Sequence, residues 1–157
     1  MTRELVFVTG FFGSSTEKKA RDIAAERGFS FISLDREIEK SDGRSVRRIC
    51  MTMGEHEYRN MEYAALEKIC ESARDSAVIA CGDGVLLDDM SAEIIRGHSL
   101  VILDMDTPEE ELWQRALREE NTYHAFMYGD HPQEKRSAFR ELYSRRKAFY
   151  ENFLSKL

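Results

Sequence analysis

The chain has 157 residues, 42% of them hydrophobic and 33% charged, which fits one globular domain, residues 1–157, with its own core. A formal net charge of -6 argues against a surface dedicated to nucleic acid, because such surfaces are usually basic. No apolar run approaches the roughly 20 residues of a membrane-spanning helix and the first residues show no signal-peptide pattern, so we expect a cytoplasmic protein that does not bind membranes.

The first half of the chain predicts two strands and two long helices. The apolar runs Leu5–Thr9 and Phe29–Ile32 are short and rich in Val, Ile, Leu and Phe, as in strands that are buried on both faces. Between them, a helix is expected over Thr16–Arg27, since Gly28 is a typical helix end. A second helix is expected over Glu55–Ala73, which carries an apolar stripe at helical spacing.

The second half repeats this alternation. The runs Ala77–Cys81 and Leu100–Leu103 predict two more buried strands. Pro108 precedes three glutamates and favours the start of a helix, and a last long helix is expected over Gln133–Phe153. Strands that alternate with helices predict an α/β fold with a parallel sheet, which binds ligands at the carboxyl ends of its strands.

The loop after the first strand lies where a phosphate-binding loop, GxxxxGK followed by Ser or Thr, would lie. Of the residues in this loop we single out Gly10, Gly13, Ser14, Ser15, Thr16 and Glu17. The first glycine of the motif is present, but Ser15, Thr16 and Glu17 stand where the motif has its second glycine, its lysine and its magnesium-binding hydroxyl. A side chain at Ser15 costs about 1–2 kcal/mol if that residue is left-handed. Ser14 and Glu17 also match a capping box, in which Glu17 would fold back onto the helix amides.

Five segments, in order, resemble the motifs of the shikimate kinases. They are Phe29–Glu39 (family F-I-D-x-D-x-x-I-E), Gly43–Ile49 (G-x-S-I-x-x-I-F), Gly54–Glu62 (G-E-x-x-F-R-x-x-E), Gly82–Gly84 (a Gly-Gly-Gly turn) and Arg146–Tyr150 (R-x-x-x-Y). Their spacing is close to that of the family, and the resemblance covers residues from about 5 to 150.

The resemblance implies a three-layer P-loop kinase-like fold in which helices flank a short parallel sheet. Where the family continues into a fifth strand, only seven residues follow Tyr150, so we expect four strands in the order 2-3-1-4 with Leu100–Leu103 at an edge. That edge is expected to be covered by the last helix, by a second copy in a homodimer or by a protein partner. The resemblance also implies a substrate-binding subregion at about 35–63 and a lid-like region at about 121–135.

The resemblance further implies a pocket for the acceptor substrate, made by Asp35, Arg59, Gly82, Gly84 and Arg146. The catalytic residue, Asp35, would accept a hydrogen bond from the hydroxyl that is phosphorylated, while the two arginines would bind the substrate carboxylate. Backbone amides near the glycines would line the ring hydroxyls, and Glu62 would orient Arg59 from one helical turn away. Taken singly, Asp35 also fits a helix N-cap, and the arginines also fit surface positions.

The departures from the family gather on the nucleotide side. Ser33 replaces an aspartate that helps to hold magnesium, and His124 stands at the position of the lid arginine. Arg115 matches a family arginine near adenine and is the main candidate for a nucleotide-binding residue that this chain retains. It also fits an ordinary exposed arginine on a helix. On the acceptor side, Asp83 places a negative charge where the family has glycine.

We therefore interpret the chain as a shikimate kinase homologue that keeps a pocket for a small hydroxylated carboxylic acid and has lost most or all phosphoryl transfer. No cofactor is certain, with Mg-ATP expected if kinase activity survives. Neither the three cysteines nor the four histidines have metal-ligand spacing, so no metal site is predicted. Two alternatives stay open: an active shikimate kinase that uses Lys18 or Lys19 and Glu17 in new roles, and a kinase of another small metabolite.

Overall fold

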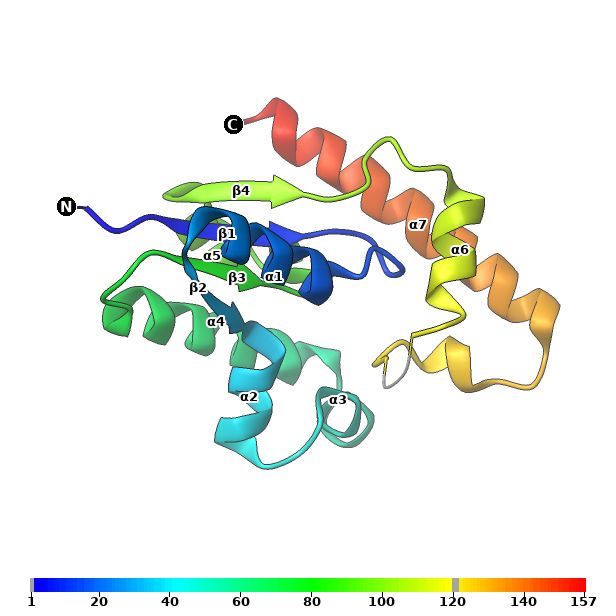
Figure 1. Ribbon diagram of the computed structural model, residues 1–157. Helices are drawn as coiled ribbons and strands as arrows, with labels where there is room; N and C mark the ends of the chain where they lie inside the picture. The colour runs from blue at the N-terminus through cyan, green and yellow to red at the C-terminus, as the bar shows by residue number, and fades with distance from the viewer. Residues whose placement is uncertain (1, 120–121) are drawn as a thin grey trace.

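The apolar runs of the sequence form the centre of the molecule. The computed structural model describes residues 2–119 and 122–157, in which four strands make one parallel sheet: β1 (Leu5–Thr9), β2 (Ser30–Ser33), β3 (Ala77–Ala80) and β4 (Ser99–Ile102). Each strand lies within one residue of its predicted bounds. The order β2-β3-β1-β4 is the predicted one, and β4 lies at an edge as expected (Figure 1).

Helices cover both faces of this sheet. They are α1 (Thr16–Arg27), α2 (Leu34–Asp42), α3 (Val46–Met53), α4 (Glu55–Ser72), α5 (Asp89–Arg96), α6 (Glu109–Ala116) and α7 (Pro132–Ser155), with short 3-10 helices η1 (Val85–Leu87) and η2 (Ala125–Tyr128). Figure 1 shows α1 on one side of the sheet and α4, α5 and α7 on the other. None of these described helices is long and apolar enough to cross a membrane.

Two apolar layers explain this arrangement. On the α1 side, Val6 and Val8 of β1 pack with Ala20 and Ala24, whose small side chains let the helix approach the sheet closely. On the other side, Phe7 belongs to a larger cluster that includes residues of α4, α5 and α7. The central strands β1 and β3 are therefore buried on both faces, as predicted, whereas the edge strands β2 and β4 are partly exposed.

The region around the second strand differs in detail from the sequence prediction. The helix α2 begins directly after β2, and its N-cap is Ser33, whose Oγ accepts a hydrogen bond from the backbone N–H of Arg36 at 3.3 Å. The N-cap alternative for Asp35 is therefore wrong, because Asp35 already lies inside the helix. The side chain of Asp35 is thereby free to turn toward α4.

The carboxyl ends of β1, β2 and β3 lie at the same edge of the sheet and lead into the functional segments. The loop of residues 10–15 follows β1, Asp35 follows β2, and the Gly82–Gly84 turn follows β3. The predicted lid-like region starts at residue 121, which lies outside the described residues. From residue 122 on, it contains η2 and the start of α7.

Candidate functional site

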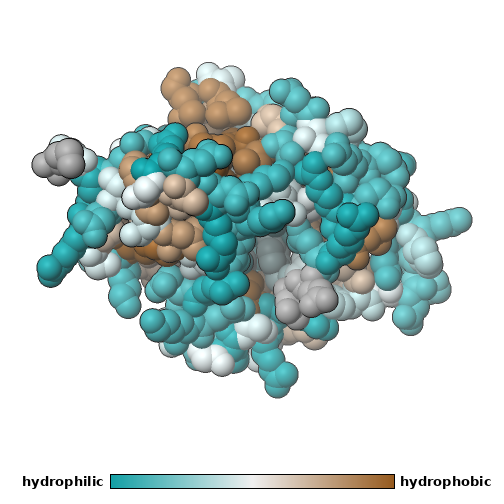
Figure 2. Space-filling model, viewed as in Figure 1, coloured by the Kyte–Doolittle hydropathy of each residue, from teal (hydrophilic) through white to brown (hydrophobic). Residues whose placement is uncertain are grey.

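A cleft of about 710 Å³ opens where these segments meet. It is lined by the loop after β1, the start of α1, the start of α2, the turn after β3 and the segment that includes Glu119 and Thr122–His124. Figure 2 shows a hollow in an otherwise mostly hydrophilic surface beside the start of α1. Polar and charged side chains dominate its wall, so the cleft is suited to a polar ligand.

The loop of residues 10–15 curls tightly although it lacks the second glycine of the motif. Ser15 has φ 53° and ψ 47°, the left-handed conformation that the sequence analysis associated with this position. Gly13 has φ 103°, and a Cβ there would lie 2.3 Å from the carbonyl oxygen of Leu112. Ser14 Oγ accepts a hydrogen bond from the backbone N–H of Phe11 at 2.9 Å. The loop thus keeps a curled backbone that presses against α6.

The predicted capping box does not form. The N-cap of α1 is Ser15, which makes no side-chain capping bond within the described structure. Glu17 instead turns outward, with Oε1 2.8 Å from Nε of Arg36 and 3.4 Å from Nη2 of Arg21. The prediction was wrong because two arginines attract the carboxylate away from the helix N-terminus.

A further carboxylate lies beside the loop. Glu119 is exposed overall but lines the cleft together with Ser15 and Thr16. Burial of the carboxyl group raises the pKa of Glu119, and the backbone N–H groups of Gly13 and Ser15 partly oppose that rise. An anion bound at the loop would therefore lie close to the Glu119 carboxylate.

Two cations near the loop are paired with Asp104. Lys19 Nζ lies 2.8 Å from Oδ2 of Asp104, and Arg115 Nη1 lies 3.3 Å from the same oxygen. Arg115 also pairs with Glu111 at 2.8 Å. Although burial opposes it, hydrogen bonds from Lys19 and Thr107 hold the pKa of Asp104 below its usual value. Both cations are therefore already neutralised.

On the acceptor side, Asp35 lies in the cleft wall and accepts a 2.6 Å hydrogen bond from the hydroxyl of Tyr58. Burial raises the pKa of Asp35 to about 6, and the bond from Tyr58 opposes the rise. Burial likewise raises the pKa of Glu62 to about 7, although Arg59 opposes it. Two buried carboxyl groups that titrate near neutral pH thus lie close to one tyrosine.

The guanidinium of Arg59 is held by several partners. It donates to Glu62 at 2.7 Å, to Glu55 at 2.6 Å and to the hydroxyl oxygen of Tyr123 at 3.0 Å. A Cβ on Gly84 would lie 2.1 Å from Nη2 of Arg59, so only glycine leaves room for the guanidinium there. Glu62 makes the contact with Arg59 that the sequence predicted.

The side chain of Asp83 lies at the centre of the acceptor end. Its Oδ2 accepts a hydrogen bond from Nε of Arg146 at 3.0 Å, and its Oδ1 lies 3.0 Å from Nε2 of His124 and 3.3 Å from the Tyr123 hydroxyl. Burial alone would raise the pKa of Asp83, but His124 and Arg146 outweigh it and hold the pKa well below its usual range. The buried carboxylate of Asp83 is therefore already paired with Arg146, one of the two arginines expected to bind the substrate carboxylate.

A model of the family described as shikimate kinase matches residues 17–156, nearly the whole chain. The chain belongs to the shikimate kinase family. A shikimate kinase of Chlorobaculum tepidum is 42% identical over 67% of this chain and 54% of that protein. A bifunctional shikimate kinase/3-dehydroquinate synthase of Thermotoga maritima is 32% identical over 94% of this chain and 28% of that protein. The chain thus spans about half the length, or less, of these curated relatives.

The fold is also that of the shikimate kinases. The structure of the Acinetobacter baumannii shikimate kinase in complex with shikimate matches with a TM-score of 0.75 and 24% identity, over 94% of this chain and 79% of that one. At this identity the likeness is one of fold. It confirms the predicted P-loop kinase-like architecture.

The residues predicted from the shikimate kinase motifs gather in two layers. Asp35, Gly82, Ser15, Thr16 and Glu17 lie in the cleft wall. Among the described residues, Arg59, Arg146, Glu62 and Gly84 are not part of that wall; the two arginines lie behind Asp83 and Tyr123, which they contact. Gly10, Gly13 and Ser14 are buried within the loop, and Arg115 lies against Asp104.

Four residues that shape this site were not predicted from the sequence: Tyr58, Asp104, Glu119 and Tyr123. Tyr58 stands where the family motif has phenylalanine, so the extra hydroxyl was a visible signal. The other residues lie outside the quoted motifs, and nothing in the local pattern indicates that they face the cleft.

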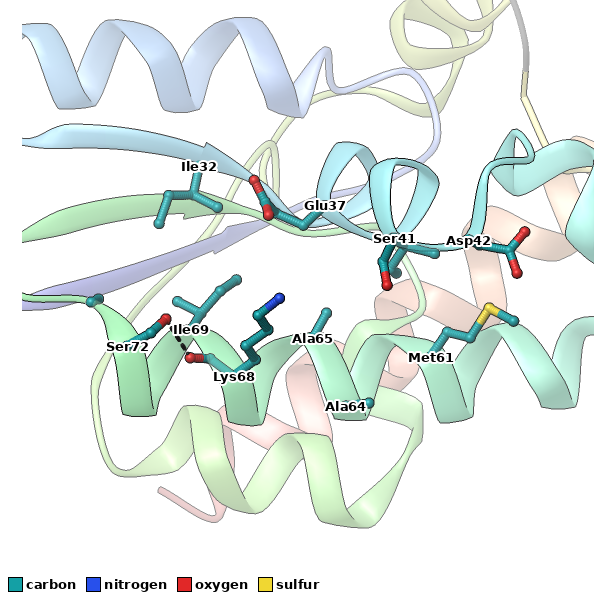
Figure 3. A pocket seen from close by; sticks show the side chains of 12 residues that line it. Ile32, Glu37, Ser41, Asp42, Met61, Ala64, Ala65, Lys68, Ile69 and Ser72 are labelled. Carbon is teal, nitrogen blue, oxygen red and sulfur yellow. Dashed lines mark hydrogen bonds between the residues drawn. The ribbon is translucent and has the colours of Figure 1, made fainter.

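A second cavity of about 400 Å³ lies between α2 and α4. Figure 3 shows Ile32 and Glu37 facing Ala65, Lys68 and Ile69 of α4 across it. Its apolar side chains belong to the packing of the two helices, while Glu37 and Lys68 are exposed surface groups. The buried ionisable groups are at the first cleft, so we place the functional site there.

Proposed function

We propose that this chain binds a small hydroxylated ring carboxylic acid of the shikimate type and transfers phosphate to it very slowly or not at all. The observation that carries the second part is the carboxylate of Glu119, which lines the cleft together with Ser15 and Thr16 of the loop region. In a phosphate-binding loop the backbone amides receive the anion, which the negative charge of Glu119 would repel here.

The charges around the loop support this proposal. Phosphoryl transfer depends on cations that neutralise the transferred phosphate. Here Thr16 stands at the lysine position, and Lys19 and Arg115 are paired with Asp104. A triphosphate at the loop would lie beside the carboxylates of Glu17 and Glu119. The cations in the described cleft wall are Lys18 and Arg36, of which Arg36 is paired with Glu17.

The residues do not fit magnesium bound to a nucleotide. Of the two positions that hold the metal in the family, one is Glu17, which pairs with Arg36 and Arg21. The other is Ser33, whose hydroxyl caps α2. Both groups already have other partners, and we derive no reaction step through the metal or the nucleotide.

The acceptor end supports the binding of a ring acid. Asp35 in the cleft wall provides a hydrogen-bond acceptor for a ring hydroxyl, and Arg59 and Arg146 lie directly behind the same wall. Guanidinium groups suit a carboxylate because they can donate two parallel hydrogen bonds. The related Acinetobacter baumannii enzyme was solved with shikimate bound.

One observation favours an active shikimate kinase with a remodelled loop. The pKa of Asp35 is raised to about 6 by burial, so this carboxylate is ionised at neutral pH yet basic enough to accept a proton from a hydroxyl. In that alternative, Thr16 and Lys18, which line the cleft, would face the phosphates.

Calorimetry with shikimate and a coupled assay of ATP-dependent shikimate phosphorylation test the proposal together. We expect heat with shikimate that is lost in Arg59→Ala. We expect turnover at least about a thousandfold below the 1–100 s⁻¹ that is typical of kinases. Turnover in the ordinary range that Asp35→Asn abolishes would establish the active enzyme instead. Binding of Mg-ATP without binding of shikimate would indicate a kinase of another metabolite.

A further inference from the structure

The carboxylate of Asp83 has the surroundings of a bound acid. One oxygen lies 3.0 Å from Nε of Arg146, and the other lies 3.0 Å from His124 Nε2 and 3.3 Å from the Tyr123 hydroxyl. The side chains of Asp83, Arg146 and His124 are only 9–10% exposed. We propose that Asp83 is an internal ligand of Arg146 that determines specificity, weakening the binding of acids relative to uncharged analogues. This inference rests on the proposed binding of ring acids in the cleft.

The order of the layers supports this role. Asp83, Tyr123 and His124 line the cleft, whereas within the described residues the guanidinium groups of Arg59 and Arg146 do not. A ligand that enters the cleft therefore meets the Asp83 carboxylate and the Tyr123 hydroxyl before it reaches either arginine. An acid must share Arg146 with Asp83 or displace it.

The charge balance at this end points the same way. Arg146 is paired with Asp83, and Arg59 is paired with both Glu62 and Glu55. Three carboxylates thus already face two guanidinium groups. A ligand carboxylate would add a further negative charge in a partly desolvated place, where unpaired charge is costly.

Acids are disfavoured without being excluded. A guanidinium has five N–H donors, and the hydrogen bond to Asp83 uses only Nε of Arg146. The other N–H donors of Arg146 can therefore bind a second carboxylate. The ring hydroxyls carry no charge and their proposed acceptor is Asp35, so the charge of Asp83 acts mainly on the ligand carboxylate.

The competing interpretation is that Asp83 only holds Tyr123, His124 and Arg146 in place. A purely structural carboxylate would affect charged and uncharged ligands alike when it is replaced. A carboxylate that competes for Arg146 would affect only the charged ligand. The ratio of the affinities for shikimate and for its methyl ester separates the two, because the ester keeps the ring hydroxyls and lacks the charge.

The experiment measures both ligands by calorimetry on the whole chain and on the variants Asp83→Asn and Asp83→Gly. Asp83→Asn removes the charge at nearly constant shape, and Asp83→Gly restores the residue of the family motif. Asp75→Asn, at an exposed position in the turn before β3, is the matched control. Circular dichroism confirms that each variant is folded, and the glycine variant serves if the asparagine variant is not.

We expect the affinity ratio of acid to ester to rise at least about tenfold in both Asp83 variants and to stay unchanged in Asp75→Asn. If the parent protein binds shikimate but neither Asp83 variant raises the affinity ratio of acid to ester, the role of Asp83 is overturned and the proposed function stays intact. Absence of shikimate binding in the parent and in every folded variant would overturn both. Binding that appears only in the variants would support the role of Asp83 and contradict acid binding by the parent chain.

Discussion

Tyr58 gives Asp35 a short hydrogen bond deep in the cleft wall, with 2.6 Å between the hydroxyl and Oδ1. The ring is fully buried, and its hydroxyl also lies near the Gly82 backbone, where a Cβ would be 3.1 Å away. The single proton of the hydroxyl goes to Asp35. Tyr58 therefore fixes the direction in which the Asp35 carboxylate points and competes with a ring hydroxyl for one of its oxygens.

Replacement of Tyr58 by phenylalanine tests this bond. The hydroxyl donates to the charged form of Asp35 and lowers its pKa, so we expect the pKa in Tyr58→Phe to rise above the value of about 6. Titration of the Asp35 carboxyl carbon by NMR measures the change. The control is Tyr63→Phe, which removes an exposed hydroxyl bonded to Glu67. A pKa that stays constant or falls in Tyr58→Phe would contradict the assigned donor.

For single residues, the sequence motifs predict which side chains lie in one site but not which hydrogen-bond partners they have. The motifs placed Asp35, Arg59 and Arg146 in one site, and the fold brings them to one end of the cleft. Their partners Tyr58, Tyr123 and Asp83 could not be assigned from a motif. A hydrogen bond depends on distances of a few tenths of an ångström between segments 23 to 64 residues apart in the chain.

The loop after β1 keeps its shape through contact with another element. Gly13 combines a φ of 103° with a position where a Cβ would lie 2.3 Å from the Leu112 carbonyl oxygen of α6. Gly28, at the end of α1, has φ 70° but open space around the missing Cβ. Replacement of Gly28 therefore tests backbone strain alone, whereas replacement of Gly13 tests strain together with steric contact with α6.

Alanine at each of these positions gives a matched comparison. We expect Gly28→Ala to lower the free energy of unfolding by about 1–2 kcal/mol, the cost of a left-handed alanine. Gly13→Ala should cost at least about 2 kcal/mol more, because the loop and α6 must separate to admit the methyl group. Urea denaturation of both variants measures the difference. Equal losses would mean that the loop does not press on α6 as described.

The long elements could be predicted from the sequence, whereas three short helices could not. Strands β1 to β4 have clear apolar patterns, and the bounds predicted for these strands and for helices α1, α4 and α7 were within two residues. The helices α2, α3 and α5 were missed because eight or nine residues make only about two helical turns, and no proline or acidic run marks their start as it does for α6. Their local signal is the N-cap: Ser33, Ser45 and Asp88 each accept a bond from the backbone N–H three residues later.

For the molecule as a whole, the sheet order follows from the family motifs and not from hydropathy. The four apolar runs predict buried parallel strands but leave their order open, because each run could pair with any other. The resemblance fixed the order 2-3-1-4, and the structure confirms it. Coverage of the β4 edge by a second copy or by a partner stays a prediction.

The buried carboxyl groups connect the site to the stability of the whole molecule. Burial raises the pKa of Asp35 from 3.8 to about 6 and that of Glu62 from 4.5 to about 7. Between those values the folded chain holds protons that the unfolded chain has released. The free energy of unfolding should therefore fall as the pH rises from about 4 to 7. Asp83 acts in the opposite sense, because its lowered pKa adds stability that is lost only as the pH falls below 3.8.

Urea denaturation at pH values from 4 to 7 measures this dependence, and two variants assign it. We expect a fall on the order of 2–3 kcal/mol for each raised carboxyl group, because one pKa unit corresponds to about 1.4 kcal/mol. Asp35→Asn should flatten the part of the curve below about pH 6, and Glu62→Gln the part that extends to about pH 7. Glu71→Gln, at an exposed position, should leave the curve unchanged. Stability that rises steadily over this range in the parent chain would mean that Asp35 and Glu62 stay ionised in the folded protein, held by Tyr58 and Arg59 against the cost of burial.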